Sequence, residues 1–277
     1  MPPQTYRVNP DDPRAPPQEV WEQLSPDERA RIVDSLPSEF PVSEAHPPEG
    51  DPHYEAKSRT REVLDSFFSR IGRKVYLACE LPVYYPGEPM FAPDVMAVLD
   101  VEPHSRMRWV VSAEGKGLDF ALEVHVAGER RKDLERNVER YARLGIREYF
   151  VFDRGRLRLS GWRLEEGRRA YRPILPQHGA YPSEVLGLDL QVEEEKLRFY
   201  VGGAALPEAP ELIARLELMV ERVEASRAEL ERQLVEETRL REEEVQRRTE
   251  ETRRREEAER RLAEALAELE RLRRERD

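Results

Sequence analysis

The segment from about residue 130 to 144 lies between two apolar, strand-like runs, and this arrangement constrains the fold more than any other feature of the chain. The segment reads RRKDLERNVERYARL, has helical spacing, and is followed by Gly145 as a stop signal. The flanking runs are FALEVHV at 120–126 and REYFVFD at 147–153. Because parallel strands need a crossover connection, a helix here allows the two strands to lie parallel. The sequence therefore predicts a sheet that is at least partly parallel.

A helix and two further strands are expected before this crossover. Residues 54–71 carry apolar side chains at helical spacing, and extended runs follow at 74–85 and 92–100 on either side of the turn PGEP. These two runs are suited to form a hairpin, and two later runs, 156–164 and 170–176, resemble an added hairpin at the sheet edge. The order helix, three strands, helix, strand predicts an α/β class with a mixed sheet and helices on its faces.

Composition divides the chain into three parts. Of the 277 residues, 37% are charged and 39% hydrophobic, which is too polar for a single core of that size. The charged excess is concentrated after about residue 207, so we expect one globular domain at 47–202. Residues 1–46 are expected to form a proline-rich arm and a short helical appendage, in which Ser25, Pro26 and Glu28 make a capping box.

Residues 207–277 are expected to form a long helical, coiled-coil-like tail. Glu and Arg at spacings of three and four residues support a helix, but the apolar stripe fades between about 236 and 259. Because a polar helix buries too little surface alone, the tail is either a homodimeric coiled coil, which we favour, or a solvated arm that meets another partner. The stripe is made by Leu212, Leu216, Met219, Val223 and Leu230, and later by Leu262, Leu266 and Leu269.

Cysteine usage and charge restrict the compartment and the partners. Cys79 is the only cysteine, which excludes an internal disulfide and a zinc site built from cysteines. No segment resembles a signal peptide or approaches the ~20 apolar residues that cross a bilayer. We expect a cytoplasmic protein without a membrane partner. The net charge of −11 argues against non-specific coating of nucleic acid, but not against an enzyme whose metal and local basic residues supply positive charge.

Two carboxylates stand on the central apolar runs. Asp94 lies in FAPDVMAVLD and Glu123 in DFALEVHV. Strands hold side chains rigidly, and two carboxylates from neighbouring strands provide the oxygen ligands that Mg²⁺ requires. This pattern suggests metal-assisted phosphodiester hydrolysis. A zinc hydrolase is disfavoured, because the histidines show no HExxH spacing.

Four phrases in this order resemble the PD-(D/E)XK restriction-endonuclease-like fold and, in detail, the Uma-two family of restriction endonucleases. The similarity covers roughly residues 47–202. The phrases are APDV at 92–95, EGKGLDFALEV at 114–124, RRKDL with YARLGIREYFVFD ending at Asp153, and PSEVLGLDL at 182–190.

The resemblance implies a metal-dependent endonuclease that hydrolyses DNA. Asp94 and Glu123 match the two acidic motifs and are expected to bind Mg²⁺, with Mn²⁺ as an alternative metal. Relatives place a catalytic lysine either two residues after the second acid or on the following helix. Those positions hold His125 and Asn137 here, and both are expected near the attacked phosphate.

The absence of lysine at these two positions leaves three alternatives open. His125 is able to exchange protons near neutral pH and substitutes for the lysine. Otherwise Lys132 or Lys116 reaches the site. In the third alternative, the domain is a degenerate nuclease fold that binds without cutting. A separate hypothesis also remains open, in which the tail is the functional part of an interaction protein and the core only caps it.

Three further residues are weighed as site members. Glu55 is interpreted as a helix-start acid rather than a metal ligand. Glu80 either extends the acidic cluster or faces solvent at a sheet edge, and the sequence does not separate these. Tyr141 is interpreted as a packing residue.

Overall fold

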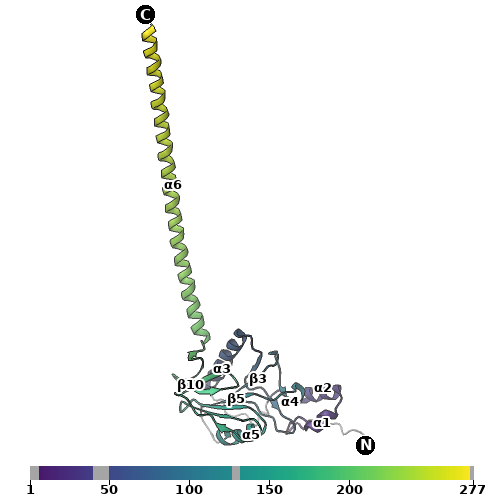
Figure 1. Cartoon of the computed structure of the whole chain (residues 1–277). Coiled ribbons are helices and arrows are strands. Elements are labelled where there is room, and N and C mark those ends of the chain that lie inside the picture. Colours follow the sequence, from purple (N-terminus) through teal and green to yellow (C-terminus); the bar gives the residue numbers. More distant parts are fainter. Residues whose placement is uncertain (1–5, 40–49, 127–131, 275–277) are drawn as a thin grey trace. The chain divides into compact units, whose positions relative to one another are not determined.

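The computed structural model describes residues 6–39, 50–126 and 132–274. The chain forms two compact units, Met1–Ala209 and Pro210–Asp277 (Figure 1). The first unit contains all the strands and the shorter helices, and the second is a single long helix.

The first unit is built around a six-stranded mixed sheet with the order β1-β3-β5-β6-β7-β8. Strands β5 and β6 are parallel, and the remaining neighbours are antiparallel. The predicted α/β class and mixed sheet are confirmed, including the β1/β3 hairpin and the edge hairpin β7/β8. The strands span Val75–Ala78 (β1), Val95–Leu99 (β3), Phe120–His125 (β5), Glu148–Asp153 (β6), Arg158–Arg163 (β7) and Arg172–Pro173 (β8).

The crossover between β5 and β6 is helical, as predicted, but its first turn is not an α-helix. Residues Lys132–Arg136 form a π-helical turn, η2, which continues as helix α5, Asn137–Arg143. The helix ends at Leu144 and Gly145, where a φ of 79° suits glycine. The expected helical residues 130 and 131 lie outside the described part of the chain. The crossover carries α5 onto one face of the sheet.

The two faces of the sheet pack against different helices. Helix α3, Asp51–Arg70, covers one face together with a second sheet, in a core that includes Phe67, Leu122 and Leu190. Helix α5 packs on the other face, in a core that includes Ala121 and Tyr141. Figure 1 shows α3 and α5 on opposite sides of β5. Strand β5 is therefore buried on both faces.

The second sheet was not predicted. It is antiparallel, with the order β12-β11-β10-β9, and it includes the phrase PSEVLGLDL. Its strands alternate buried and partly exposed residues, as expected for a sheet with one face on a core. The strands span Tyr181–Ser183 (β9), Leu188–Glu193 (β10), Lys196–Val201 (β11) and Ala204–Ala205 (β12).

One expected strand is divided. The run 74–85 was expected to be continuous, but β1 ends at Ala78 and a separate strand β2, Val83–Tyr84, pairs in parallel with β4, Trp109–Val110. The break lies at Glu80, whose φ of 50° is left-handed and ends the extended conformation. The short helix α4, Val111–Glu114, directly follows β4.

The N-terminal part of the first unit contains two short helices, α1 (Gln18–Gln23) and α2 (Pro26–Ser35). Helix α2 begins with the predicted capping box, because the Ser25 side chain accepts from the Glu28 N–H and the Glu28 carboxylate accepts from the Ser25 N–H. Leu36, directly after α2, packs with Tyr84 of β2. The appendage is thus connected to the domain by a small apolar core.

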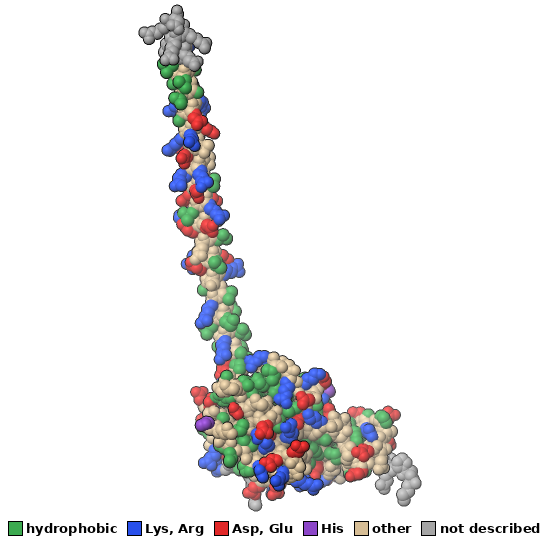
Figure 2. Space-filling model, viewed as in Figure 1, with side chains coloured by type: hydrophobic (Ala, Val, Ile, Leu, Met, Phe, Trp, Pro, Cys, Tyr) green, Lys and Arg blue, Asp and Glu red, His purple; other side chains and the backbone are tan. Residues whose placement is uncertain are grey.

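The second unit is the helix α6, Ala209–Arg274, which confirms the predicted long helix. Charged side chains of both signs alternate along it with hydrophobic ones (Figure 2). Ion pairs at spacings of three and four residues, such as Arg227–Glu231 and Arg248–Glu244, support it locally. No helix in the described residues combines the length and apolar character that crossing a bilayer requires.

Glu148 connects the two sheets of the first unit. It starts β6, is fully buried, and its Oε1 accepts from Arg163 Nε at 2.8 Å and from the Glu184 N–H at 2.9 Å. The Ser183 hydroxyl donates to the other carboxylate oxygen. Because Ser183 and Glu184 lie at the end of β9, this one carboxylate joins the second sheet to the central one.

We expect Glu148→Ala to lower the free energy of unfolding by about 3 kcal/mol, because the Arg163 Nε and the buried Ser183 hydroxyl lose the carboxylate to which they donate. Urea denaturation followed by circular dichroism measures this. The matched control is Glu165→Ala, which removes the exposed ion pair with Arg172 at 2.8 Å and should cost at most about 1 kcal/mol. Equal losses in the two variants would contradict the structural role of Glu148.

Candidate active site

The two carboxylates predicted from the sequence lie next to each other where β3 and β5 pair. Val95 pairs with Leu122, so Asp94 and Glu123 follow in the same antiparallel register. The Val124 N–H donates to Asp94 Oδ2 at 2.7 Å, and the Asp94 N–H donates to Glu123 Oε2 at 3.3 Å. Backbone groups of the two strands therefore orient both side chains.

Glu123 is also held from the opposite face by α5. The Tyr141 hydroxyl donates to Glu123 Oε1 at 2.9 Å. Burial, and then the neighbouring Glu123 carboxylate, raise the pKa of Tyr141 well above its usual range, so the hydroxyl keeps its proton and acts as a donor. Tyr141 packs in the core as expected, but it also positions a candidate site residue.

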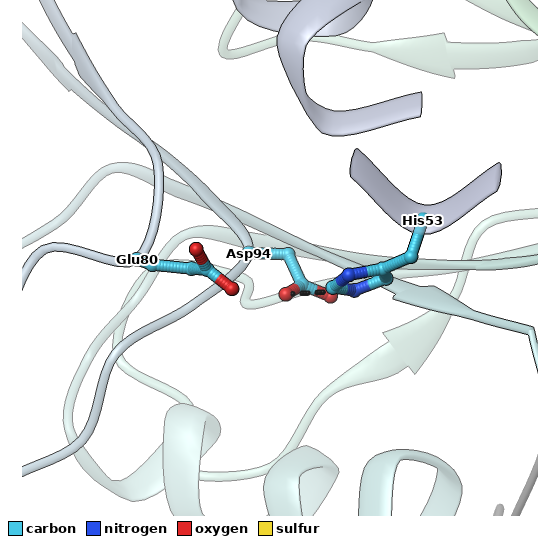
Figure 3. Close-up of side chains that lie close together, drawn as sticks. All are labelled: His53, Glu80 and Asp94. Atoms are coloured by element: carbon cyan, nitrogen blue, oxygen red, sulfur yellow. Dashed lines mark ion pairs between the residues drawn. The ribbon is translucent and has the colours of Figure 1, made fainter. Parts of the chain in front are cut away.

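His53 and a second carboxylate, that of Glu80, also lie next to Asp94. His53, in the first turn of α3, places Nε2 3.1 Å from Asp94 Oδ1. Figure 3 shows Asp94 between His53 and Glu80. One ligand atom from each of these three residues lies within 4.8 Å of the others. Glu123 is not a member of this group. Asp94 therefore has two sets of neighbours, Glu123 in one and His53 with Glu80 in the other.

A buried lysine completes the arrangement. Lys57 lies one turn after His53 on α3, and only 5% of its surface is exposed. Its Nζ is 2.5 Å from Glu80 Oε1. Lys57 is the only lysine that is buried among the side chains that the structure describes. The positive charge beside the cluster therefore belongs to Lys57 on α3. It does not come from positions 125 and 137, where the sequence led us to look for a lysine.

Those two positions, His125 and Asn137, are both buried and both engaged by neighbouring groups. His125 ends β5 and shares a sheet face with Glu123, because side chains alternate along a strand. Asn137 begins α5, one turn before Tyr141 and on the same helix face. Both side chains are thus placed toward the α5 side of Glu123.

The other lysines and acids weighed from the sequence lie elsewhere. Lys116 Nζ donates to the Leu99 carbonyl at 2.5 Å and pairs with Asp119 at 3.1 Å, at the end of β3 opposite to Asp94. The side chain of Lys132 lies outside the described part of the chain. Glu55 is exposed and does not belong to the cluster. Glu80, which the sequence left undecided, is a member of it.

Sequence reasoning missed His53 and Lys57, although one signal was present. Lys57 falls on the apolar stripe of α3, with Thr60 and Leu64 at helical spacing behind it. A charged residue on the buried side of an amphipathic helix needs a buried partner, and the pattern alone does not identify that partner. His53 precedes Lys57 by four residues and so shares its face.

A polar groove of about 520 Å³ runs along β1 and α3. Its walls include Tyr54, Ser58 and Cys79, and Arg61 and Arg106 also line it. His53, Lys57, Glu80 and Asp94 are not among its lining residues, so the groove is separate from the cluster.

The donor set fits a divalent cation. Asp94 and Glu80 offer the carboxylate oxygens that Mg²⁺ and Mn²⁺ prefer, and the His53 nitrogen favours Mn²⁺ over Mg²⁺ in affinity. Glu123 offers a further carboxylate beside Asp94, outside that group. His53 is already oriented by Asp94, and Asp94 by the backbone of Val124. Such orienting contacts are typical of metal sites.

Comparisons with known proteins identify the family of the chain. The family model Uma2, described as "Putative restriction endonuclease", matches residues 42–193, a little over half of the chain. No curated protein matches. Among solved structures, one described as a putative nuclease belonging to DUF820 from Anabaena variabilis ATCC 29413 is 13% identical, with a TM-score of 0.42. That match covers 52% of this chain and 80% of the other.

We expect Tyr141→Phe to weaken Mn²⁺ binding about tenfold, because Glu123 loses a donor that orients it. Isothermal titration calorimetry measures the affinity, and the melting temperature should change little, since the ring still packs. The matched control is Tyr171→Phe, which removes a hydroxyl that donates to the Ile146 carbonyl at 2.7 Å. Unchanged Mn²⁺ affinity in Tyr141→Phe would exclude this role for the hydroxyl.

Proposed function

Because the chain belongs to the Uma2 family of restriction-endonuclease-like proteins, we propose that it hydrolyses DNA phosphodiester bonds with the help of a divalent cation. The observation that carries the proposal is the pairing of Asp94 with Glu123 across β3 and β5, in which each carboxylate accepts a hydrogen bond from the backbone of the opposite strand. This arrangement presents two oriented carboxylates at one end of the sheet.

Asp94 and Glu123 are the proposed ligands of Mg²⁺ or Mn²⁺, and His53 and Glu80 flank them. When bound there, the cation supplies positive charge to the phosphate and makes a water molecule more acidic. The chain's own contribution is orientation: Tyr141 holds Glu123, and the Val124 N–H holds Asp94. Fixed ligands need no rearrangement when the phosphate arrives.

His125 and Asn137 are proposed to lie near the attacked phosphate. His125 shares a strand face with Glu123, and its imidazole offers a nitrogen that hydrogen-bonds a water or a phosphate oxygen. Asn137 offers an amide that hydrogen-bonds a water or a phosphate oxygen. Neither side chain carries a permanent positive charge.

The groove along β1 and α3 supports a nucleic-acid strand as the substrate. Tyr54 is 68% exposed at its wall, and an exposed aromatic ring is a surface on which a base stacks. Arg61 lines the same groove and carries a charge that suits phosphate.

The second candidate function is a catalytically degenerate nuclease fold that binds DNA or acts as an interaction module. One observation favours it: the positions that relatives use for lysine hold His125 and Asn137. This alternative predicts metal-independent binding and no cleavage.

Nicking of supercoiled plasmid in Mg²⁺ or Mn²⁺ tests the proposal. We expect Asp94→Asn and Glu123→Gln to lower the rate at least ~100-fold, because each removes charge from the cation site. Calorimetry should show weaker Mn²⁺ binding in both variants. The matched control is Asp100→Asn, because Asp100 is exposed directly after the other end of β3 and its left-handed φ of 57° suits asparagine.

A wild-type protein that binds Mn²⁺ and DNA but does not nick plasmid would favour the degenerate alternative. A protein that neither nicks plasmid nor binds metal contradicts the proposed function. Nicking that survives in both variants would show that the activity does not come from this site or that a contaminating nuclease causes it.

We also propose that α6 forms a homodimeric coiled coil. Along the predicted stripe, Leu216 and Val223 are 60% and 67% exposed, and Leu262, Leu266 and Leu269 repeat the spacing near the end of the helix. Apolar side chains at such spacing on a helix are buried when a second helix packs against them. The weak central part of the stripe predicts a marginal association.

We expect the full chain to sediment as a dimer at micromolar concentration and Leu216→Glu/Val223→Glu to sediment as a monomer, because charges enter the seam. The control Arg215→Ala/Arg222→Ala changes the net charge by the same amount on neighbouring positions of α6 and should remain dimeric. Analytical ultracentrifugation distinguishes these outcomes. A monomeric wild-type chain would contradict the homodimer and would favour the alternative in which α6 binds a different partner.

A further inference from the structure

Lys57 is an unusual residue for its position on α3. Its surface is 5% exposed, and it lies on the helix face that packs toward the sheet, between Ala56 and Thr60 of the same buried stripe. Removing an ammonium group from water is costly unless a close partner compensates. An apolar side chain at this position would fill the space without that cost.

The partner of Lys57 is itself held in an unfavourable conformation. Glu80 Oε1 lies 2.5 Å from Lys57 Nζ, and Glu80 adopts a φ of 50°, which is uncommon for a residue with a side chain. The Glu80 N–H donates to the Pro93 carbonyl at 3.0 Å, directly before Asp94. The bend at Glu80 thus places the Lys57–Glu80 pair next to Asp94. Strained backbone of this kind concentrates at functional sites.

The other described lysines do not bring positive charge to this end of the sheet. Lys116 pairs with Asp119 at the opposite end of β3, Lys74 pairs with the exposed Glu102, and Lys196 contacts Glu208. Lys57 is therefore the described lysine that lies beside Asp94 and Glu80. The Glu80 side chain that pairs with it is 57% exposed, so this end of the pair is open to solvent.

We propose that Lys57 is a catalytic residue whose ammonium group contacts a non-bridging oxygen of the attacked phosphate. In the unliganded chain, Glu80 neutralises this charge and holds the side chain extended toward the cluster. When a phosphodiester occupies the site, the ammonium donates hydrogen bonds to it and offsets the charge that develops on its oxygens. The inference deepens the proposed function, on which it rests.

Removing the charge with Lys57→Met provides the test. We expect the nicking rate to fall about 100-fold, because a charged donor to the transferring group is lost. We also expect the affinity for a fluorescein-labelled oligonucleotide in Ca²⁺ to fall about tenfold, since one phosphate contact is lost. Mn²⁺ affinity, measured by calorimetry without DNA, should stay equal or rise, because a positive charge beside the cation site is removed. Lys57→Arg, which keeps the charge, should retain most of the oligonucleotide affinity.

The matched control is Lys74→Met, which breaks a lysine–glutamate pair of the same kind at an exposed position and should behave like the wild type. If Lys57→Met does not fold, Lys57→Gln replaces it, because glutamine removes the charge but keeps a donor for Glu80. Melting temperatures are measured for every variant.

Two results overturn the role of Lys57 and leave the proposed function standing. One is a Lys57→Met variant that cuts and binds the oligonucleotide like the wild type. The other is a parallel loss of melting temperature, Mn²⁺ affinity and nicking in Lys57→Met and Lys57→Gln, which would mean that Lys57 is only structural. A wild-type chain that neither cuts nor binds the oligonucleotide in Ca²⁺ overturns both proposals together.

Discussion

The pairing of β5 with β3 on one side and with β6 on the other is the constraint on which the rest of the first unit depends. Strand β5 is buried on both faces, antiparallel to β3 and parallel to β6. The parallel pair requires the crossover that places α5, and hence Tyr141, over the end of β5. The antiparallel pair sets the register that brings Asp94 beside Glu123. A shift of one residue in that register would turn Glu123 toward the opposite face and separate the carboxylates.

The candidate site is assembled from segments that are far apart in the sequence. Helix α3 contributes His53 and Lys57, the bend after β1 contributes Glu80, and the strands contribute Asp94 and Glu123. Each of these side chains is oriented by a group on a different element. This explains why the site requires the packing of α3 against the sheet and is not a property of one motif.

Two ionic arrangements in the first unit, one around Glu148 and one between Lys57 and Glu80, differ in how far their carboxylates are exposed to solvent. Glu148 is fully buried, and its carboxylate accepts from Arg163, Ser183 and the Glu184 N–H, so its polar atoms are satisfied within the fold. In the other arrangement the buried partner is a lysine, and Glu80 is 57% exposed at its side chain. A pair with one exposed member is open to a solvent-borne ligand on that side, whereas the Glu148 carboxylate is enclosed by its partners. The Glu148 network stabilises the joint between the two sheets.

The sequence by itself determined the order of the elements, the mixed sheet, the capping box of α2, the long helix α6 and the pair Asp94 and Glu123. Most of these are local features, because hydrophobic periodicity, caps and turn residues act within a few neighbouring positions. For Asp94 and Glu123 the sequence placed each acid on an apolar run, and the register of β3 and β5 brought the two together. Only the tertiary structure decided the second sheet, the bend at Glu80, and the meeting of His53 and Lys57 with Asp94. Lys57 and Glu80 are 23 residues apart, and no local pattern specifies which buried partner a helical lysine will meet. That choice depends on strand register and on the packing of α3, which are properties of the folded chain.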